Sequence, residues 1–149
     1  MGRIVVGVDG SEPSKRALEL AARQAHLTGD LLQVVTAWEL PPLFASSSAA
    51  AVTEIPVDLD LAGEAEERLH RTIDEVLGAE HGLELHTTVV EGHPAPSLLD
   101  AAEGADLVVV GSSGHGEFAG MLLGSVSMYL ATHSPCPVLI ARSKERPGS

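Results

Sequence analysis

Aromatic side chains are scarce in this sequence of 149 residues. One Trp, one Tyr and two Phe make up its 3% of aromatic residues. So few rings leave little for stacking on successive bases, and a formal net charge of −12 repels a phosphate backbone. Nucleic acid is therefore not an expected partner, and aliphatic packing has to supply most of the core.

Cysteine is also scarce, and long apolar runs are missing. Cys136 is the single cysteine, so no internal disulfide can form, which fits a reducing compartment. No apolar run approaches the ~20 residues that a membrane-spanning helix needs. The sequence enters an apolar segment at Arg3 without a basic leader. We expect a cytoplasmic protein that does not bind membranes.

The sequence does contain a regular alternation of strand and helix patterns. Residues 3–9 are nearly all apolar and β-branched, as in a central parallel strand covered on both faces. Further strand patterns follow at 31–37, 83–90, 107–110 and 138–140. The second of these four alternates in part, which favours a place nearer an edge. Helical patterns separate the strands, at 11–29, 59–77, 96–104 and up to 132.

This alternation predicts a single α/β domain over residues 1–149: an open, parallel, five-stranded sheet of Rossmann-like type with helices on both faces. Residues 39–57 show no clear period, and we expect a mobile loop there. The polar residues 143–149 are expected to form a frayed tail. In such sheets ligands bind beyond the carboxyl ends of the strands, where the winding direction reverses.

A glycine-rich segment follows the fourth predicted strand, from Gly111 to Ser125. Glycine allows the backbone to approach an anion closely, and the N–H groups at the start of the next helix favour phosphate. The sequence has neither a GxxxxGK[ST] loop nor a GxGxxG opening its first helix. From the residues alone, the glycines fit either a phosphate loop or tight turns and close helix packing.

Gly111, Gly114, Gly124 and Ser125 match the pattern G-x2-G-x9-G-[ST]. In this signature the sequence resembles the universal stress protein family. The segments 5–11 and 134–139 are also similar to that family, so the resemblance covers nearly the whole chain. It implies ATP bound along the strand ends, often with Mg²⁺ or Mn²⁺ on the phosphates, and homodimers paired through the last strand. Family members that lack the glycine signature generally do not bind ATP.

The resemblance also implies roles for single residues. Asp9 would accept hydrogen bonds from the ribose hydroxyls, although it could also cap the following turn. Ala37 would offer backbone groups to the adenine edge, and Gly92 would form a turn beside the nucleotide, although a plain structural turn explains it nearly as well. The phosphates would lie among Gly111, Ser112, Gly114, His115, Gly124 and Ser125. His115 could reach the γ-phosphate or face solvent, and we assign it no catalytic role.

Neither a catalytic residue nor a protein-built metal site is predicted. The histidines lack the paired spacing of zinc ligands, and any Mg²⁺ or Mn²⁺ would be held by ATP oxygens and water. Fast hydrolysis usually needs an arginine or lysine near the phosphates, and none lies between Arg71 and Arg142. We expect a nucleotide-dependent stress sensor or regulator with little or no hydrolysis.

Two other functions compete with this one. A receiver domain would place an aspartate after its third strand and a lysine near its fifth, where this sequence has Glu91 and only the late Lys144. A nucleotide-free dimeric module would keep the fold and leave the loop empty. The apolar run 137–141 invites pairing of the last strand in either case.

Overall fold

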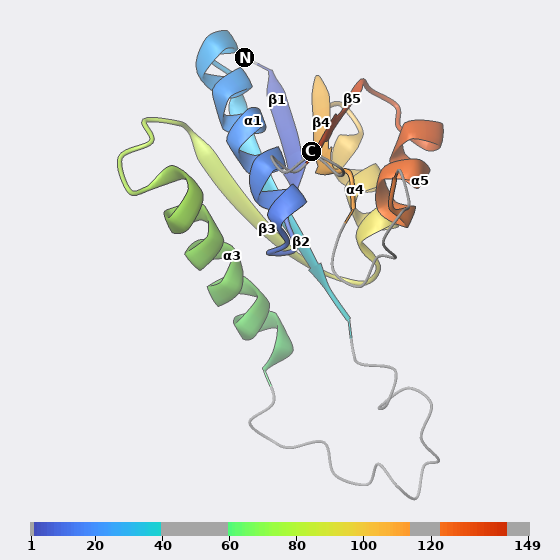
Figure 1. The fold of residues 1–149 in the computed structure, drawn as a ribbon, viewed down its shortest axis with the longest axis horizontal. Coiled ribbons are helices and arrows are strands. Elements are labelled where there is room, and N and C mark those ends of the chain that lie inside the picture. The colour runs from blue at the N-terminus through green and yellow to red at the C-terminus, as the bar shows by residue number, and fades with distance from the viewer. Residues whose placement is uncertain (1, 40–59, 114–122, 143–149) are drawn as a thin grey trace, which may run out of the picture.

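The computed structural model describes residues 2–39, 60–113 and 123–142. Its parallel sheet has five strands in the order β3-β2-β1-β4-β5 (Figure 1). The strands are β1 (Arg3–Gly7), β2 (Leu31–Trp38), β3 (Leu85–Glu91), β4 (Leu107–Gly111) and β5 (Val138–Ala141). The described helices are α1 (Glu12–Thr28), α3 (Leu61–Leu77), α4 (Pro94–Ala102) and α5 (Ser125–His133). The predicted fold class is confirmed.

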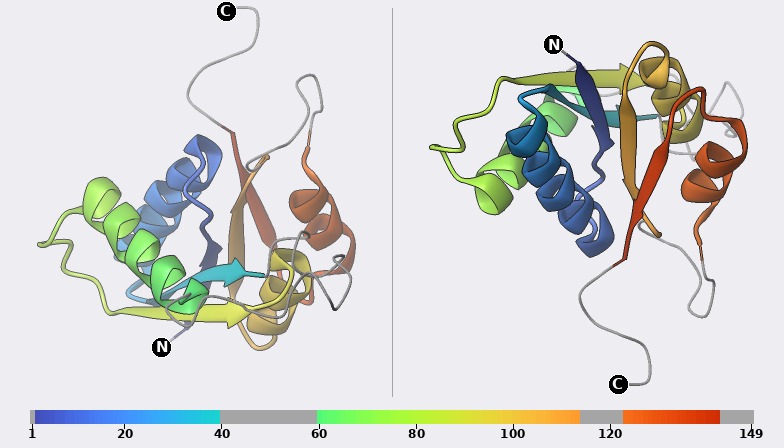
Figure 2. Two further views of the ribbon diagram at one scale, coloured as in Figure 1. Left: turned by 90° about the horizontal axis from the view of Figure 1, so that it is seen from below. Right: turned by 90° about the horizontal axis from the view of Figure 1, so that it is seen from above.

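Helices cover both faces of the sheet (Figure 2). On one face α1 and α3 enclose a core that includes Ile4, Val6 and Leu32, and on the other α4 and α5 enclose Val5 and Val108. Neighbouring residues of β1 thus point to opposite faces, as the period of a strand requires. Both sides are apolar because a parallel sheet is buried on both faces, which explains the continuous apolar runs in the sequence.

The first helix begins and ends as the sequence predicts. The Ser11 hydroxyl accepts a hydrogen bond from the Ser14 N–H at 3.3 Å, and Pro13 lies in the first turn. Gly29 ends the helix in the left-handed conformation at φ 76°, and its N–H donates to the Ala25 carbonyl. The capping residues therefore set the limits of α1.

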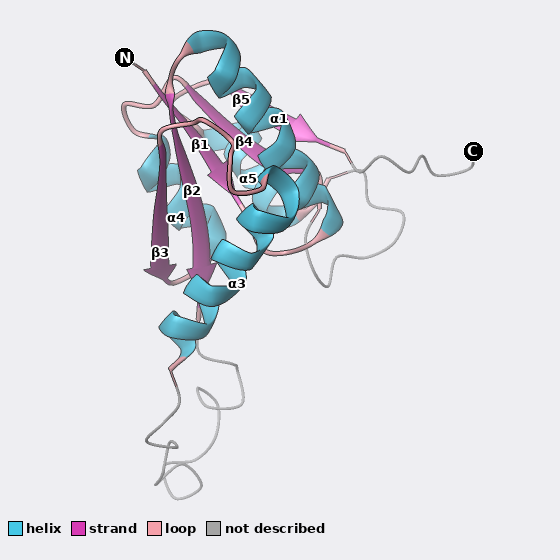
Figure 3. Ribbon diagram, turned by 90° about the vertical axis from the view of Figure 1, so that its left-hand side faces the viewer, coloured by secondary structure: helices cyan, strands magenta, loops and turns pink. Residues whose placement is uncertain are grey.

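Helix α4 and strand β3 lie close to the positions predicted from the sequence. Helix α4 begins at Pro94, two residues before the predicted Pro96, because proline is also well suited to a first turn. It ends at Ala102, and Gly104 follows at φ 77° as the expected left-handed glycine. Strand β3 lies at an edge of the sheet, as expected (Figure 3). Of the predicted 39–57 loop only Glu39 is described, and the 143–149 tail lies outside the described residues.

The amino end of the sheet is held together by its own polar groups. The N–H of Gly2 donates to Asp30 at 2.9 Å, and the N–H of Arg3 donates to Asp106 at 2.8 Å. The Arg3 guanidinium donates to the Gln33 side chain and to the carbonyls of Ala101 and Glu103 near the end of α4, at 2.7 to 2.8 Å. Within the described ranges, no helix has the length and apolar character needed to cross a membrane.

Candidate functional site

The order of the strands marks one point where a ligand site is expected. From β1 the chain winds to β2 and β3 on one side, and it then returns to build β4 and β5 on the other. The winding direction therefore reverses between β1 and β4. Ligands of open α/β sheets bind in the crevice beyond the carboxyl ends of the strands at such a reversal.

A cavity of about 250 Å³ lies at this point. We call it the carboxyl-edge cavity. Five of the predicted site residues line it: Asp9, Ala37, Gly111, Gly124 and Ser125. Gly92 and Ser112 do not line it, and Gly114 and His115 lie outside the described residues.

The walls of the carboxyl-edge cavity combine apolar side chains with the starts of three helices. Its apolar lining includes Val8, Val35, Leu98, Val110 and Val126. Ser14 of α1, Pro94 of α4 and the first residues of α5 belong to first turns. Helix N-termini carry a partial positive charge and N–H groups without intrahelical acceptors, which suit anions. No lysine or arginine is among its lining residues in the described part of the chain. Among these lining groups, the positively polarised ones are the helix starts.

Asp9 has a structural role of its own. Its Oδ1 accepts a hydrogen bond from the Ser11 N–H at 2.9 Å, and its N–H donates to the Ser14 hydroxyl at 3.3 Å. The turn-capping role considered from the sequence is therefore present. An ionised carboxylate offers about four acceptor positions on its two oxygens, and this side chain is exposed.

Two of the predicted site glycines are explained by the fold itself. A Cβ on Gly111 would lie 2.7 Å from the carbonyl carbon of Pro13, so the start of α1 packs directly on this glycine. Gly92 has φ 135°, which side chains rarely adopt, and its N–H donates to the Trp38 carbonyl at 2.7 Å. Close packing and a turn therefore require these two residues to be glycine, whatever the ligand.

Gly124 is different. It precedes α5 at φ −76° and ψ 174°, a conformation that any residue adopts. Its N–H donates to the Ser112 carbonyl at 2.6 Å, and the Ser112 N–H donates to the Ala141 carbonyl at 2.7 Å. Ser112 thus contributes through its backbone, by connecting the end of β4 with β5 and with the start of α5.

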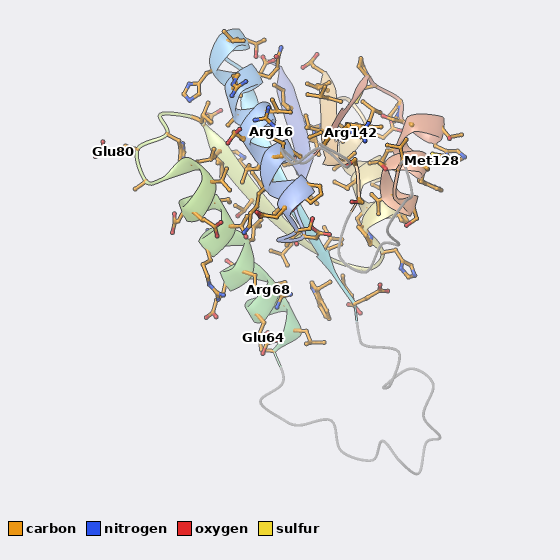
Figure 4. The ribbon with its side chains drawn as sticks, in the orientation of Figure 1. Arg16, Glu64, Arg68, Glu80, Met128 and Arg142 are labelled. Carbon is orange, nitrogen blue, oxygen red and sulfur yellow. The ribbon has the colours of Figure 1, made fainter. Side chains whose placement is uncertain are left out.

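The structure also shows residues that the sequence analysis missed. Ser14 and Ser127 are buried polar residues that line the cavity from first helical turns. Arg142 follows β5, and the register of Gly111 with Ala141 places it beside the end of β4 (Figure 4). It makes no hydrogen bond or ion pair with the described residues. In the sequence, Arg142 stands out only by its position directly after the last predicted strand. That position places it near the site only because β5 pairs in parallel with β4.

Among the residues described, no three or more His, Cys, Asp or Glu side chains are grouped so that they could hold a metal ion. Lys15, next to Ser14 on α1, has its ammonium 2.9 Å from Glu75 and 3.4 Å from Glu12. The hydrogen bond to Glu75 raises the pKa of Lys15. This ammonium is therefore already neutralised by two carboxylates.

Comparisons with known proteins agree with the fold and the signature. The model of the universal stress protein family matches residues 1–142. Universal stress protein Rv1996 of Mycobacterium tuberculosis is 37% identical over 146 residues, which cover 97% of this chain and 45% of that protein. The chain thus spans less than half the length of this relative.

Solved structures also share this fold, and two of them serve as examples. Universal stress protein UspA from Lactobacillus plantarum superposes with a TM-score of 0.72 at 23% identity, covering 95% of this chain and 97% of that one, which concerns the fold alone. A universal stress protein in complex with cAMP superposes with a TM-score of 0.60 at 30% identity, covering 96% of this chain and 98% of that one.

Proposed function

The chain belongs to the universal stress protein family, and from that premise we propose that it binds an adenine nucleotide, ATP in particular, in the carboxyl-edge cavity. We infer that it acts in the cytoplasm as a nucleotide-dependent sensor or regulator of a stress response. One observation carries the proposal: Asp9, Ala37 and the pair Gly124-Ser125 come from three separate segments and line a single cavity at the reversal of the sheet.

In this proposal the nucleotide lies across the ends of β2, β1 and β4. The base packs on the apolar wall near Val35 and Leu98, next to the backbone of Ala37, and the ribose hydroxyls donate to Asp9. The phosphates lie at the first turn of α5, where helix N–H groups and the Ser125 hydroxyl favour anions. Small-molecule sites usually measure ~300–1,000 Å³, so part of the nucleotide extends beyond the cavity of about 250 Å³.

The proposed site fits a divalent cation only as a companion of the phosphates. Mg²⁺ prefers oxygen ligands and often binds through phosphates, water and one or two carboxylates. Asp9 is the one carboxylate among the described lining residues. Mg²⁺ or Mn²⁺ would therefore be held mainly by phosphate oxygens and water, and it would neutralise charge that no lining lysine or arginine of the described part neutralises.

The same lack of basic lining residues supports slow turnover. Phosphoryl transfer is accelerated by arginine or lysine groups that stabilise the charge of the transition state. Lys15 is paired with Glu12 and Glu75, and Arg142 does not line the cavity in the described structure. We expect ATP hydrolysis far below the ~1–100 s⁻¹ of kinases. A phosphate-release assay with purified protein measures this rate, and a rate in the kinase range would contradict a sensor.

The nucleotide proposal is tested on gently purified protein. Heat-denatured samples are expected to release an adenine nucleotide that chromatography identifies. Calorimetry on nucleotide-free protein is expected to show tighter binding of ATP than of AMP, because more phosphates contact α5. Equal affinities would contradict the phosphate subsite, and no binding of any nucleotide would favour a nucleotide-free interaction module.

Cyclic AMP is a second candidate ligand, because the similar structure at 30% identity is a complex with cAMP. Its single cyclic phosphate would place less charge at α5 than the triphosphate of ATP does. Competition calorimetry separates the two: ATP as the natural ligand is expected to displace cAMP at equal concentration. The reverse order would make the protein a cAMP-binding member of the family.

We also propose a homodimer formed through β5. This strand is an edge of the sheet, and Leu139 is 37% exposed on it. Unpaired backbone groups beside an exposed leucine promote association unless they are covered. Antiparallel pairing of β5 with its copy would satisfy those groups across a two-fold axis. Val138 and Ile140 already pack on the core between the sheet, α4 and α5, so Leu139 is the residue of the strand most available to a partner.

Light scattering tests the dimer. Wild-type protein is expected to be dimeric at micromolar concentration, and Leu139→Lys is expected to shift it toward monomer or aggregate. Ile140→Lys is expected to have the same effect with additional loss of stability, because Ile140 packs on the core. Lys144→Glu, beyond the strand, is the control and should change little. A monomeric wild-type protein would refute the proposal.

A further inference from the structure

Ser127 is a polar residue in an unusual place. It lies in the first turn of α5, it is 1% exposed, and it lines the carboxyl-edge cavity. Buried hydroxyl groups are stable only when they are hydrogen-bonded, so its partners indicate why a serine is present.

The Ser127 hydroxyl is shared between two carbonyl groups. It lies 3.0 Å from the oxygen of Gly124, three residues earlier, and 3.1 Å from the oxygen of Ser112, at the exit of β4. A hydroxyl has a single proton to donate, so the bond is divided between them. The Ser112 carbonyl also accepts the Gly124 N–H at 2.6 Å. Residue 112, where the glycine-rich segment leaves β4, is thereby joined directly to the start of α5.

Two other serines at helix starts make contacts that are more local in sequence. The Ser14 hydroxyl donates to the carbonyl of the N-cap Ser11 and accepts the N–H of Asp9, five residues earlier. The Ser97 hydroxyl donates to the His93 carbonyl at the start of α4. The Ser127 hydroxyl, in contrast, reaches the backbone of Ser112 at the end of β4, 15 residues away. Capping of its own helix therefore does not account for this contact.

We propose that Ser127 is a positioning residue that gives the site its preference for the phosphate part of a nucleotide. Its hydroxyl holds the first turn of α5 against the exit of β4. The N–H groups of that turn and the Ser125 hydroxyl then face the phosphates in a fixed orientation. This inference rests on the nucleotide-binding function proposed above, and Ser127 itself need not touch the ligand.

The two parts of the cavity should respond differently to its loss. Without the hydroxyl, the Ser112 carbonyl keeps its bond from the Gly124 N–H, so the chain path survives while α5 gains freedom to shift. Val35 and Ala37 belong to β2 and should keep their places. Binding of the phosphates is weakened, and binding of the nucleoside is not.

The test is calorimetric titration of wild type and variants with ATP and with adenosine. Ser127→Ala is expected to weaken ATP binding about three- to tenfold, the worth of one net hydrogen bond, and to leave the adenosine affinity within about twofold. Ser127→Thr keeps the hydroxyl but adds a methyl group in a buried place. It should lower the melting temperature and still retain the wild-type ratio of the two affinities. Ser97→Ala is the matched control, expected to leave both affinities unchanged.

Each outcome decides the proposal. Equal weakening of ATP and adenosine by Ser127→Ala, or no change in either, would overturn it, because a purely structural serine gives no selective effect. If Ser127→Ala does not fold, Ser127→Cys takes its place, since a thiol is similar in size but a weak donor, with the same selective loss expected. Wild-type protein that binds no ATP would instead refute the proposed function.

Discussion

The polar groups at the two ends of the parallel sheet differ in whether the protein itself supplies their hydrogen-bond partners. At the amino end, backbone N–H groups of Gly2 and Arg3 are taken up by Asp30 and Asp106, and the Arg3 guanidinium binds the end of α4. At the carboxyl end, three helices begin around a cavity lined by glycines, serines and short aliphatic side chains. At the amino end these polar groups are bound by the protein itself, and the carboxyl end has room for a ligand.

This difference follows from the direction of the helices. In each β–α unit the helix starts at the carboxyl end of the sheet, so positive helix ends gather there and negative ends gather at the amino end. An arginine at the amino end can bind the carbonyl groups that end α4. The positive helix ends suit an anion, and no lining carboxylate other than Asp9 competes with one in the described part of the cavity. Stability and binding should therefore be separable by mutation.

The largest effect is expected for Gly111→Val, because Gly111 both packs against the start of α1 and lines the carboxyl-edge cavity. A side chain there meets the backbone of Pro13, with contacts from 2.7 Å, so β4 and α1 would have to move apart. Overpacking typically costs ~1–3 kcal/mol, and a clash with backbone atoms belongs at the upper end, about 3 kcal/mol. The melting temperature should fall by roughly 6–12 °C, and ATP binding should weaken with it. Thermal unfolding followed by circular dichroism measures the change, and an unaltered melting temperature would show that Gly111 is not a packing glycine.

Arg3→Ala should damage only the amino end. The variant loses three donated hydrogen bonds, and hydrogen bonds to a charged group contribute ~1.5–3 kcal/mol. Because the side chain is partly exposed, we expect a total loss near the lower bound of this range. The melting temperature should decrease by about 3–6 °C with an unchanged Kd for ATP. A parallel loss of ATP affinity would mean that the two ends of the sheet are coupled.

Gly124→Val should produce the reverse pattern. The backbone angles at Gly124 are open to any residue, so the fold should remain, whereas a branched side chain at the start of α5 blocks the close approach of phosphate. We expect ATP affinity to fall at least tenfold, about 1.4 kcal/mol, with a melting temperature close to that of wild type. A folded Gly124→Val protein with full ATP affinity would rule out the phosphate subsite at α5.

The smallest effects concern the two cations near the carboxyl end. Arg142 is exposed and without a partner in the described structure, so Arg142→Ala should weaken ATP binding about two- to fivefold at low salt, and less at high salt. Lys15 is neutralised by Glu12 and Glu75, so Lys15→Met should leave ATP affinity unchanged. Calorimetry at two salt concentrations measures the ATP affinity of both variants. Equal effects of the two substitutions would contradict the different roles given to Arg142 and Lys15.

Lys15 also predicts a dependence of stability on pH. Its pKa is raised from 10.5, chiefly by the hydrogen bond to Glu75, so its ion pairs stabilise the fold fully below pH 10.5. That contribution is lost as the pH rises through the raised value. The small difference in melting temperature between wild type and Lys15→Met should therefore vanish in strongly alkaline solution. If the difference in melting temperature persists at that pH, it arises from packing of the aliphatic part of the Lys15 side chain and not from its ion pairs.

Much of the candidate site could be predicted from local patterns. Asp9 follows a strand, and Gly124-Ser125 precedes a helix, and such positions lie at the carboxyl edge of any parallel sheet. The roles of single glycines could not be separated in this way. Gly111 and Gly124 belong to one signature, yet one is a packing contact with Pro13 and the other has ordinary backbone angles. Close packing depends on which helix crosses over the strand, and the neighbouring residues in the sequence do not determine this.

What the sequence alone determined is the set of elements, their caps and their order, because strand and helix periods and capping residues act over a few neighbouring positions. Ser11 and Gly29 bound α1 for this reason. The tertiary structure decided which distant groups meet. The bond from Ser127 to the Ser112 carbonyl and the place of Arg142 beside the end of β4 both depend on the pairing of β4 with β5 and on the path of α5. Such contacts join residues whose separation in sequence carries no period, so only the packed chain shows them.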